Sequence, residues 1–154
     1  MQGCEYRLLW WKTGAAYERR YRDHDYWHNL RPDAYVAYQV GRHRIRFWLE
    51  WDRATIGTRD LVAKLSTYAQ YVASREWFKE KATLPLLLVV TPDPGQEMRL
   101  GRVATATLTG GRGLIIRTTT LKRVREQGLL GPIWDQVIPH SEETDLMPRR
   151  TFYR

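Results

Sequence analysis

The chain has 154 residues, of which 43% are hydrophobic and 27% charged, an ordinary globular composition that excludes a disordered chain, collagen and a coiled coil. Lys and Arg number 25 against 17 Asp and Glu, and the single cysteine, Cys4, excludes an internal disulfide and a Cys-rich zinc site. There is no apolar run of roughly 20 residues as in a membrane helix, and we expect no secretory leader. We therefore expect a cytoplasmic protein without membrane contact, with one domain over 1–154, a core over about 5–135 and a basic, irregular tail over 136–154.

The positive charge points to a polyanionic partner. The net charge is +8, and the sequence pI of about 9.9 exceeds the value of about 9 that is typical of nucleic-acid-binding domains. Arginine dominates the cations, and its planar guanidinium binds phosphate through two parallel hydrogen bonds. The composition favours a nucleic-acid binder, with a merely solvated basic surface as the alternative.

The N-terminal part of the chain predicts strands. Residues 5–12 are expected to form a strand, and residues 15–30, which have no clean period, a loop. Residues 34–40 and 43–51 are rich in β-branched and aromatic side chains and flank Gly41-Arg42, which predicts a hairpin with a two-residue type II′ turn. Apolar and charged residues alternate in its second strand, so that one face is expected to be apolar and the other charged.

The remaining chain alternates helices and strands. Thr58 is a plausible N-cap for the next helix, and the continuous apolar run that follows this helix is typical of a central strand buried on both faces. Asp93-Pro94 caps a further helix. The predicted elements are a helix over 58–81, a strand over 84–90, a helix over 94–108, a strand over 114–117 and a helix from 118–120 to 127. This order predicts an α/β fold, with a mixed β-sheet flanked by helices.

Three carboxylates are expected to gather at one end of the hairpin. With a two-residue turn, Val40 pairs with His43, so Asp33 lies opposite Glu50, and Asp52 points to the same face. A slipped register would move Asp33 to the other face.

Clustered carboxylates need raised pKa values or a cation to relieve their repulsion. Mg²⁺ or Mn²⁺ takes few protein carboxylates, activates water and stabilises charge on a scissile phosphate. The pattern therefore suggests a metal-dependent phosphodiesterase with Asp33, Glu50 and Asp52 as metal ligands. In the alternative, Asp33 begins a turn and the other two acids pair with Arg44, Arg46 or Arg53.

Short motifs in a fixed order carry a resemblance to a known family. They are Arg31-Pro32-Asp33-Ala34, then Leu49-Glu50-Trp51-Asp52-Arg53-Ala54-Thr55, then Leu61-x-x-Lys64-Leu65-x-x-Tyr68, then Leu87-Leu88-Val89-Val90-Thr91-Pro92. Over roughly residues 5–135 the chain resembles the catalytic-like domain of the replication-relaxation family of plasmid and mobile-element proteins. The resemblance implies a role in plasmid replication or DNA relaxation, and as partners DNA together with a winged-helix segment or a second copy of the chain.

The same stretch resembles the core of the PD-(D/E)XK nucleases, which have the restriction-endonuclease-like fold. That resemblance implies that Asp33 is the first acid and Glu50 the second. Asp52 stands where the family pattern has a lysine. Some members carry that lysine on the following helix, and Lys64 is then the candidate that orients the attacking water or balances the phosphate charge. In the alternative, Lys64 makes a surface pair with Asp60, four residues before it.

Arginines beside the hairpin turn and side chains of the next helix are expected to contact DNA, although charged residues also protect the edge strand of a sheet. These candidates are Arg42, Arg44, Arg46, Arg53, Tyr68, Tyr71 and Arg75.

The leading hypothesis is a metal-dependent DNA endonuclease of a plasmid or mobile element, or a degenerate relative, with Asp33, Glu50, Asp52 and Lys64 as catalytic residues. The second is a non-catalytic DNA-binding or replication-accessory module, and the third is a protein-interaction domain with scattered arginines. Convergence of Asp33, Glu50 and Lys64 distinguishes the first hypothesis from the second.

Overall fold

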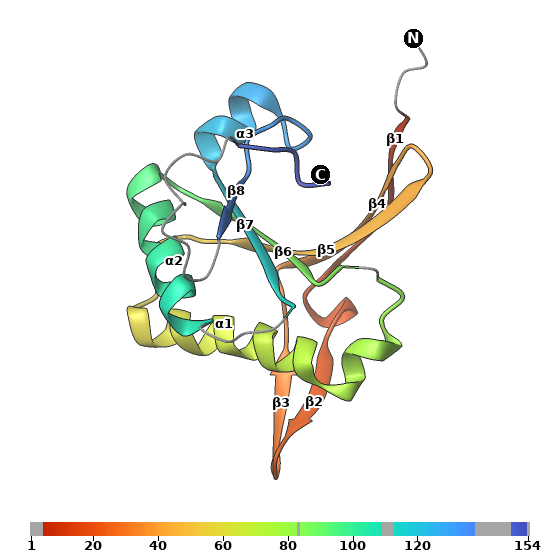
Figure 1. The fold of residues 1–154 in the computed structure, drawn as a ribbon, viewed down its shortest axis with the longest axis vertical. Helices are drawn as coiled ribbons and strands as arrows, with labels where there is room; N and C mark the ends of the chain where they lie inside the picture. Colours follow the sequence, from red (N-terminus) through yellow and green to blue (C-terminus); the bar gives the residue numbers. More distant parts are fainter. Residues whose placement is uncertain (1–4, 83, 109–112, 138–148, 154) are drawn as a thin grey trace.

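The protein folds around a mixed sheet of six strands, in the order β1-β4-β5-β6-β7-β8, with a second sheet formed by β2 and β3 (Figure 1). The computed structural model describes residues 5–82, 84–108, 113–137 and 149–153, so Cys4 lies outside the described residues. Helices lie beside the sheet (Figure 1). The predicted α/β class, a mixed sheet flanked by helices, is therefore confirmed.

One half of the sheet is antiparallel and contains the predicted hairpin. β1 (Tyr6–Thr13) pairs with β4 (Ala34–Val40), and β4 pairs with β5 (His43–Trp51). Val40 lies opposite His43, which confirms the predicted register. Gly41 has a φ of 59°, as the first central residue of a type II′ turn requires.

The prediction of a loop over residues 15–30 is wrong. After a short 3₁₀-helix, η1 (Gly14–Ala16), β2 (Arg19–Asp23) and β3 (Tyr26–Leu30) pair as an antiparallel hairpin. Its strands have five residues each, and only Tyr21 and Leu30 are buried in them. Such short strands give little apolar alternation for a sequence pattern to detect.

The first helix is shorter than predicted. α1 (Thr58–Ala73) buries Leu61, Leu65, Tyr68 and Val72, as the apolar stripe predicted. It begins after Gly57 and not after Thr58, and it ends before Ser74, whose backbone is extended and whose hydroxyl donates to the carbonyl of Tyr71. The chain continues as a 3₁₀-helix, η2 (Arg75–Lys79), where a continuous helix to Lys81 was expected.

The other half of the sheet is mostly parallel. β6 (Leu86–Thr91) is buried at every position and lies between β5 and β7 (Ile115–Thr120), parallel to both, as a central strand should be. α2 (Pro94–Thr107) begins at the predicted cap, because Asp93 Oδ1 accepts the backbone N–H of Gln96 at 2.9 Å.

The C-terminal part is more regular than expected. α3 (Leu121–Gln127) follows its cap, Thr120. β8 (Asp135–Val137) then adds an antiparallel strand to β7, and Trp134 forms a bridge with Arg150. Within the expected tail, residues 136–137 and Arg150 are thus paired in a strand or bridge, whereas residues 149 and 151–153 are irregular as predicted; residues 138–148 lie outside the described part.

Both faces of the sheet are covered. On one face Trp48 packs with residues of α1 and α2, and on the other Phe47 packs with Trp134 and Phe152 from the C-terminal part. The face of β5 that was expected to be charged is therefore buried at Trp48 and Glu50, which turn towards α1, whereas Arg44 on the same face is exposed. In the described residues no helix is long and apolar enough to cross a membrane.

Candidate functional site

A cavity of about 210 Å³ opens where β5 ends and α1 begins. Glu50 is the last residue but one of β5, Asp33 directly precedes β4, and Lys64 lies on α1. All three line this cavity, and so do Asp52 and Tyr68. The structure therefore brings together Asp33, Glu50 and Lys64, the three residues whose convergence the nuclease hypothesis requires.

Glu50 is the centre of the site. It is 4% exposed, its Oε1 accepts the hydroxyl of Tyr68, and its Oε2 lies 2.7 Å from Lys64 Nζ. Burial raises the pKa of Glu50 to about 7, against the lowering effect of the Lys64 ammonium. The charged carboxylate is thus tolerated inside the protein because α1 supplies a cation and a hydroxyl to it.

The partner of Lys64 is not the one that the surface-pair alternative predicted. Its ammonium pairs with Glu50 across the site, and in the described part of the chain it makes no ion pair with Asp60. Its side chain is 42% exposed. Lys64 therefore connects the buried carboxylate with the open side of the cavity.

Tyr68 and Tyr71 are core residues. Tyr68 is 1% exposed, and its ring lies 5.4 Å from that of Trp48. Tyr71 is fully buried and donates its hydroxyl to Glu80 Oε1 at 2.6 Å. The predicted contact of these rings with DNA is therefore not supported, because neither ring is accessible.

The other two carboxylates are held by backbone groups. Asp33 Oδ2 accepts the N–H of Trp51 at 2.7 Å, which ties the start of β4 to the end of β5. Asp52 Oδ1 accepts the N–H of Ala54 at 2.8 Å, and Ala54 has a φ of 57°, so Asp52 shapes the turn that follows β5.

The carboxylates do not form a three-acid metal cluster. Among the residues that the structure describes, no group of three or more His, Cys, Asp and Glu is close enough to hold a metal ion, so the structure lends no support to Asp52 as a third ligand.

The predicted DNA-contacting arginines do not gather at the cavity. Arg42 and Arg44 are exposed at the hairpin turn, and Arg44, the nearer of the two, is about 20 Å along the strand from Glu50 at roughly 3.3 Å per residue. Arg46 lies over the ring of Trp10, at 5.4 Å. Arg75 is exposed beyond the end of α1, and only Arg53 lines the cavity.

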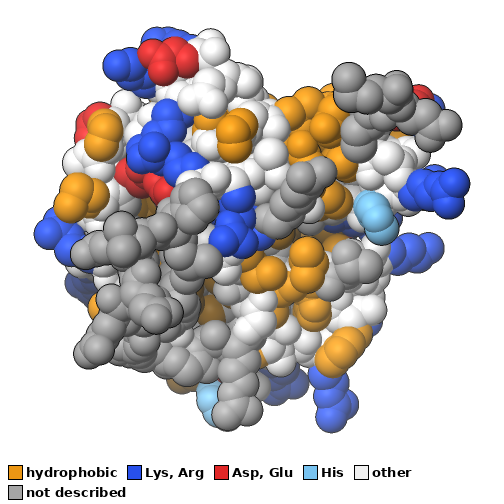
Figure 2. All heavy atoms as spheres, turned by 45° about the horizontal axis from the view of Figure 1, so that its top comes forward, with side chains coloured by type: hydrophobic (Ala, Val, Ile, Leu, Met, Phe, Trp, Pro, Cys, Tyr) orange, Lys and Arg blue, Asp and Glu red, His pale blue; other side chains and the backbone are white. Residues whose placement is uncertain are grey.

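Lys and Arg side chains are also spread over the face shown in Figure 2, where exposed hydrophobic side chains lie between them. A second, mostly apolar cavity of about 340 Å³ lies between β1, β4, β5 and the C-terminal part. Neither feature adds a charged group to the Glu50 cavity.

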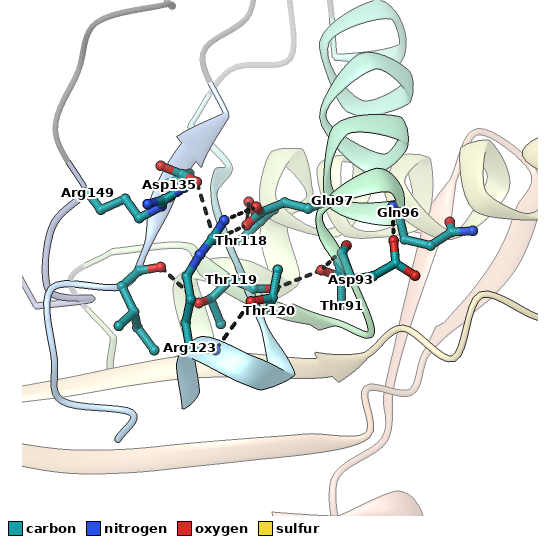
Figure 3. A network of polar contacts seen from close by, with 11 residues as sticks. Thr91, Asp93, Gln96, Glu97, Thr118, Thr119, Thr120, Arg123, Asp135 and Arg149 are labelled. Carbon is teal, nitrogen blue, oxygen red and sulfur yellow. Dashed lines mark hydrogen bonds and ion pairs between the residues drawn. The ribbon is translucent and has the colours of Figure 1, made fainter. Parts of the chain in front are cut away.

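Two buried polar networks were not anticipated from the sequence. In the first, Glu80 Oε1 accepts the hydroxyls of Tyr17 and Tyr71 and the Nε of Arg19. In the second, Arg123 lies 2.8 Å from Glu97 and 3.5 Å from Asp135 (Figure 3). Their members come from separate elements, so no sequence spacing signals them, and none lines the Glu50 cavity.

The fold and this cavity define an α/β protein with a paired glutamate and lysine at the end of a central strand. The family model described as Replication-relaxation matches residues 3–87, which is more than half of the chain, and the chain belongs to this family. The match includes Asp33, Glu50, Lys64 and Tyr68. Membership suggests a protein related to plasmid or mobile-element replication. Searches of curated proteins and of solved structures found no match.

Proposed function

We propose that the protein binds DNA and hydrolyses phosphodiester bonds with a divalent metal ion, as a member of the PD-(D/E)XK nucleases with their restriction-endonuclease-like core. The observation that carries this proposal is the 2.7 Å contact between Lys64 Nζ and Glu50 Oε2 in a cavity that Asp33 also lines. An acid before one strand, an acid at the end of its neighbour and a lysine on the next helix form the pattern that this resemblance implies.

In this proposal Asp33 and Glu50 hold Mg²⁺ or Mn²⁺. When bound, the ion supplies an activated water and stabilises charge on the phosphate. Tyr68 fixes the orientation of Glu50 through its hydroxyl. Lys64, which is partly exposed, orients the attacking water or balances the phosphate charge.

A second candidate function is that of a non-catalytic DNA-binding or replication-accessory module. It is favoured by the fact that both oxygens of Glu50 already face a donor, Tyr68 on one side and Lys64 on the other. In that case the Lys64 ammonium neutralises Glu50 permanently, and the arginines supply affinity for DNA.

A nicking assay on supercoiled plasmid distinguishes the two candidates. Wild type is incubated with Mn²⁺ and, separately, with EDTA, beside the variants Asp33→Ala and Asp33→Asn. The asparagine keeps an oxygen for the N–H of Trp51, so its effect is not due to a lost backbone contact. Asp60→Asn, at an exposed position in the first turn of α1, is the matched control.

Nicking that needs Mn²⁺, is lost in both Asp33 variants and persists in Asp60→Asn is the result expected of the nuclease. Equal nicking by wild type and Asp33→Asn contradicts the proposed site. Absence of nicking together with a salt-sensitive gel shift supports the accessory module, because phosphate contacts weaken steeply with salt.

A further inference from the structure

The β2–β3 hairpin projects from the body of the protein beyond α1 (Figure 1). Its inner face is fixed on that helix: Tyr21 is fully buried, and its hydroxyl donates to the carbonyl of Thr67 at 3.2 Å and to Gln70 Oε1 at 3.0 Å. At its base, Arg19 Nε donates to Glu80 at 2.8 Å. The hairpin is therefore an arm with a defined orientation.

The outer face of this arm carries cations and an aromatic ring. Arg20 lies opposite Asn29 and Arg22 lies opposite Trp27, so these four side chains share one face, and all four are exposed. Trp27 is 61% exposed, and the Arg20 guanidinium lies 5.3 Å from its ring.

The arm makes little use of these groups within the protein. Arg22 has a distant acidic neighbour, Asp25 at 3.8 Å, and the two side chains are 58% and 94% exposed. Tyr26 at the tip is also exposed, at 74%, but it points to the opposite face from Trp27. An exposed indole ring beside two arginines that have no close acidic partner among the described residues favours a surface that meets a partner.

The chemistry of the arm fits unpaired nucleic acid. Proteins bind single strands by stacking bases on aromatic rings while arginines follow the phosphates, and an asparagine amide hydrogen-bonds base edges. The ring of Trp27 is accessible to such bases, whereas bases inside a duplex are already stacked on one another. The two arginines match the charge of the strand.

The arm also leads to the candidate site. β3 ends at Leu30 and Asp33 follows three residues later, a span of at most about 11 Å. Arg31, between them, is exposed. A strand lying along the outer face of the arm thus reaches the mouth of the Glu50 cavity within a few nucleotides.

We propose that the outer face of the β2–β3 hairpin, formed by Arg20, Arg22, Trp27 and Asn29, binds unpaired DNA beside the Glu50 cavity. This inference rests on the proposed function, because it names the form of DNA that the site receives.

The test compares the affinities of a fluorescent oligothymidine of about 20 nucleotides and a duplex of the same length. Wild type is measured beside Trp27→Ala and the double variant Arg20→Gln/Arg22→Gln. The controls are Trp11→Ala, an exposed tryptophan on β1, and Arg102→Gln/Arg125→Gln, two exposed arginines of α2 and α3. Circular dichroism shows that each variant is folded, and plasmid nicking is assayed in parallel.

Trp27→Ala is expected to weaken oligothymidine binding at least about fivefold, the lower end of base–aromatic stacking, and to change duplex binding less, while the Trp11 control matches wild type. The double substitution Arg20→Gln/Arg22→Gln is expected to reduce the salt dependence of oligothymidine binding more than the control substitution Arg102→Gln/Arg125→Gln does.

The outcomes separate the two proposals. If wild type nicks or binds DNA but Trp27→Ala binds oligothymidine as tightly as wild type does, the proposed role of the arm is contradicted and the proposed function stands. If wild type neither binds nor nicks DNA, both are overturned. Heparin, a polyanion without bases, serves as a further ligand. If Arg20→Gln/Arg22→Gln loses affinity for heparin and for oligothymidine equally, and Trp27→Ala loses affinity for neither, the arm binds polyanions or acidic proteins in general. Base stacking by the arm is then contradicted.

Discussion

Lys64 Nζ lies 2.7 Å from Glu50 Oε2, and one helical turn further along α1 the Tyr68 hydroxyl donates to the other oxygen of the same carboxylate. Residues four apart on a helix share a face, which is why one helix supplies both donors. A glutamate that is 4% exposed is thereby kept in the core with a pKa of about 7, near the pH at which a carboxyl group can serve either as an acid or as a base.

The raised pKa of Glu50 predicts how stability depends on pH in the absence of metal. Because the folded protein holds this proton more tightly than the unfolded chain, the free energy of unfolding should fall as the pH rises from about 4.5 to about 7 and then level off. A shift from 4.5 to about 7 corresponds to a loss of at most about 3 kcal/mol. Urea unfolding of wild type and Glu50→Gln in EDTA measures this contribution.

The difference in stability between wild type and Glu50→Gln should change across this window, because glutamine does not titrate. Glu126→Gln is the matched control, since Glu126 is an exposed glutamate of α3 with a distant lysine partner at 3.9 Å. A difference between wild type and Glu50→Gln that is constant from pH 4.5 to 8 would show that the carboxyl titrates normally in the fold.

Removing the cation should extend this pH dependence to higher pH, because the pKa of Glu50 then loses the lowering effect of Lys64. In Lys64→Met, the carboxylate of Glu50 loses its ion pair while it stays buried, so the variant should be less stable than wild type by about 1–3 kcal/mol at pH 8. At pH 5 the loss should be small, because Glu50 is then protonated. Lys122→Met, whose side chain is 82% exposed, should stay within about 0.5 kcal/mol of wild type. Equal destabilisation by Lys64→Met at pH 5 and pH 8 would instead indicate lost packing.

The sequence contained enough information to place Asp33 beside Glu50. A two-residue turn with glycine first fixes the register of β4 and β5, and the alternation of β5 leaves no freedom to slip by one residue without exposing the core. The convergence of Lys64 on Glu50 followed from a family resemblance and not from spacing, because helix periodicity alone left Asp60 as an equally good partner.

Other features depended on packing that no local pattern records. The β2–β3 hairpin has five-residue strands and is held on α1 by Tyr21. The contacts that stabilise it are therefore with a helix that is distant in the sequence. Glu80 follows η2, beyond the end of α1. It becomes a buried acceptor only because the fold brings Tyr17 and Arg19, about sixty residues earlier in the chain, within hydrogen-bonding distance. Tyr68 and Tyr71 looked suitable for DNA because exposure cannot be read from helix spacing when both faces of a sheet are covered.

The Glu80 network should be a strong determinant of stability. Its Oε1 accepts hydrogen bonds from Tyr17 at 2.8 Å, Tyr71 at 2.6 Å and Arg19 at 2.8 Å. Glu80→Ala leaves buried hydroxyls without this acceptor and should cost about 3 kcal/mol or more. Glu76→Ala, which removes an exposed pair with Lys79, should cost less than about 1 kcal/mol.

Hydrogen exchange adds a local readout to this prediction. Because Arg19 anchors the base of β2 to Glu80, amides of the β2–β3 hairpin should exchange faster in Glu80→Ala than in Glu76→Ala, beyond the change expected from global stability. Unchanged protection of the hairpin in Glu80→Ala would show that the contacts with α1 alone hold it.

Lys64 should oppose metal binding while it supports cleavage. A divalent ion held by Asp33 and Glu50 would lie close to the Lys64 ammonium, and like charges repel. Lys64→Met should therefore bind Mn²⁺ at least about fivefold more tightly than wild type, as measured by isothermal titration calorimetry, and yet nick plasmid more slowly. Asp33→Asn should lose both properties, whereas Asp60→Asn should keep both. If Lys64→Met and wild type bind Mn²⁺ equally well, the ion does not lie beside Glu50, and the carboxylate would then be better explained as a structural partner of Lys64 and Tyr68 in a DNA-binding module.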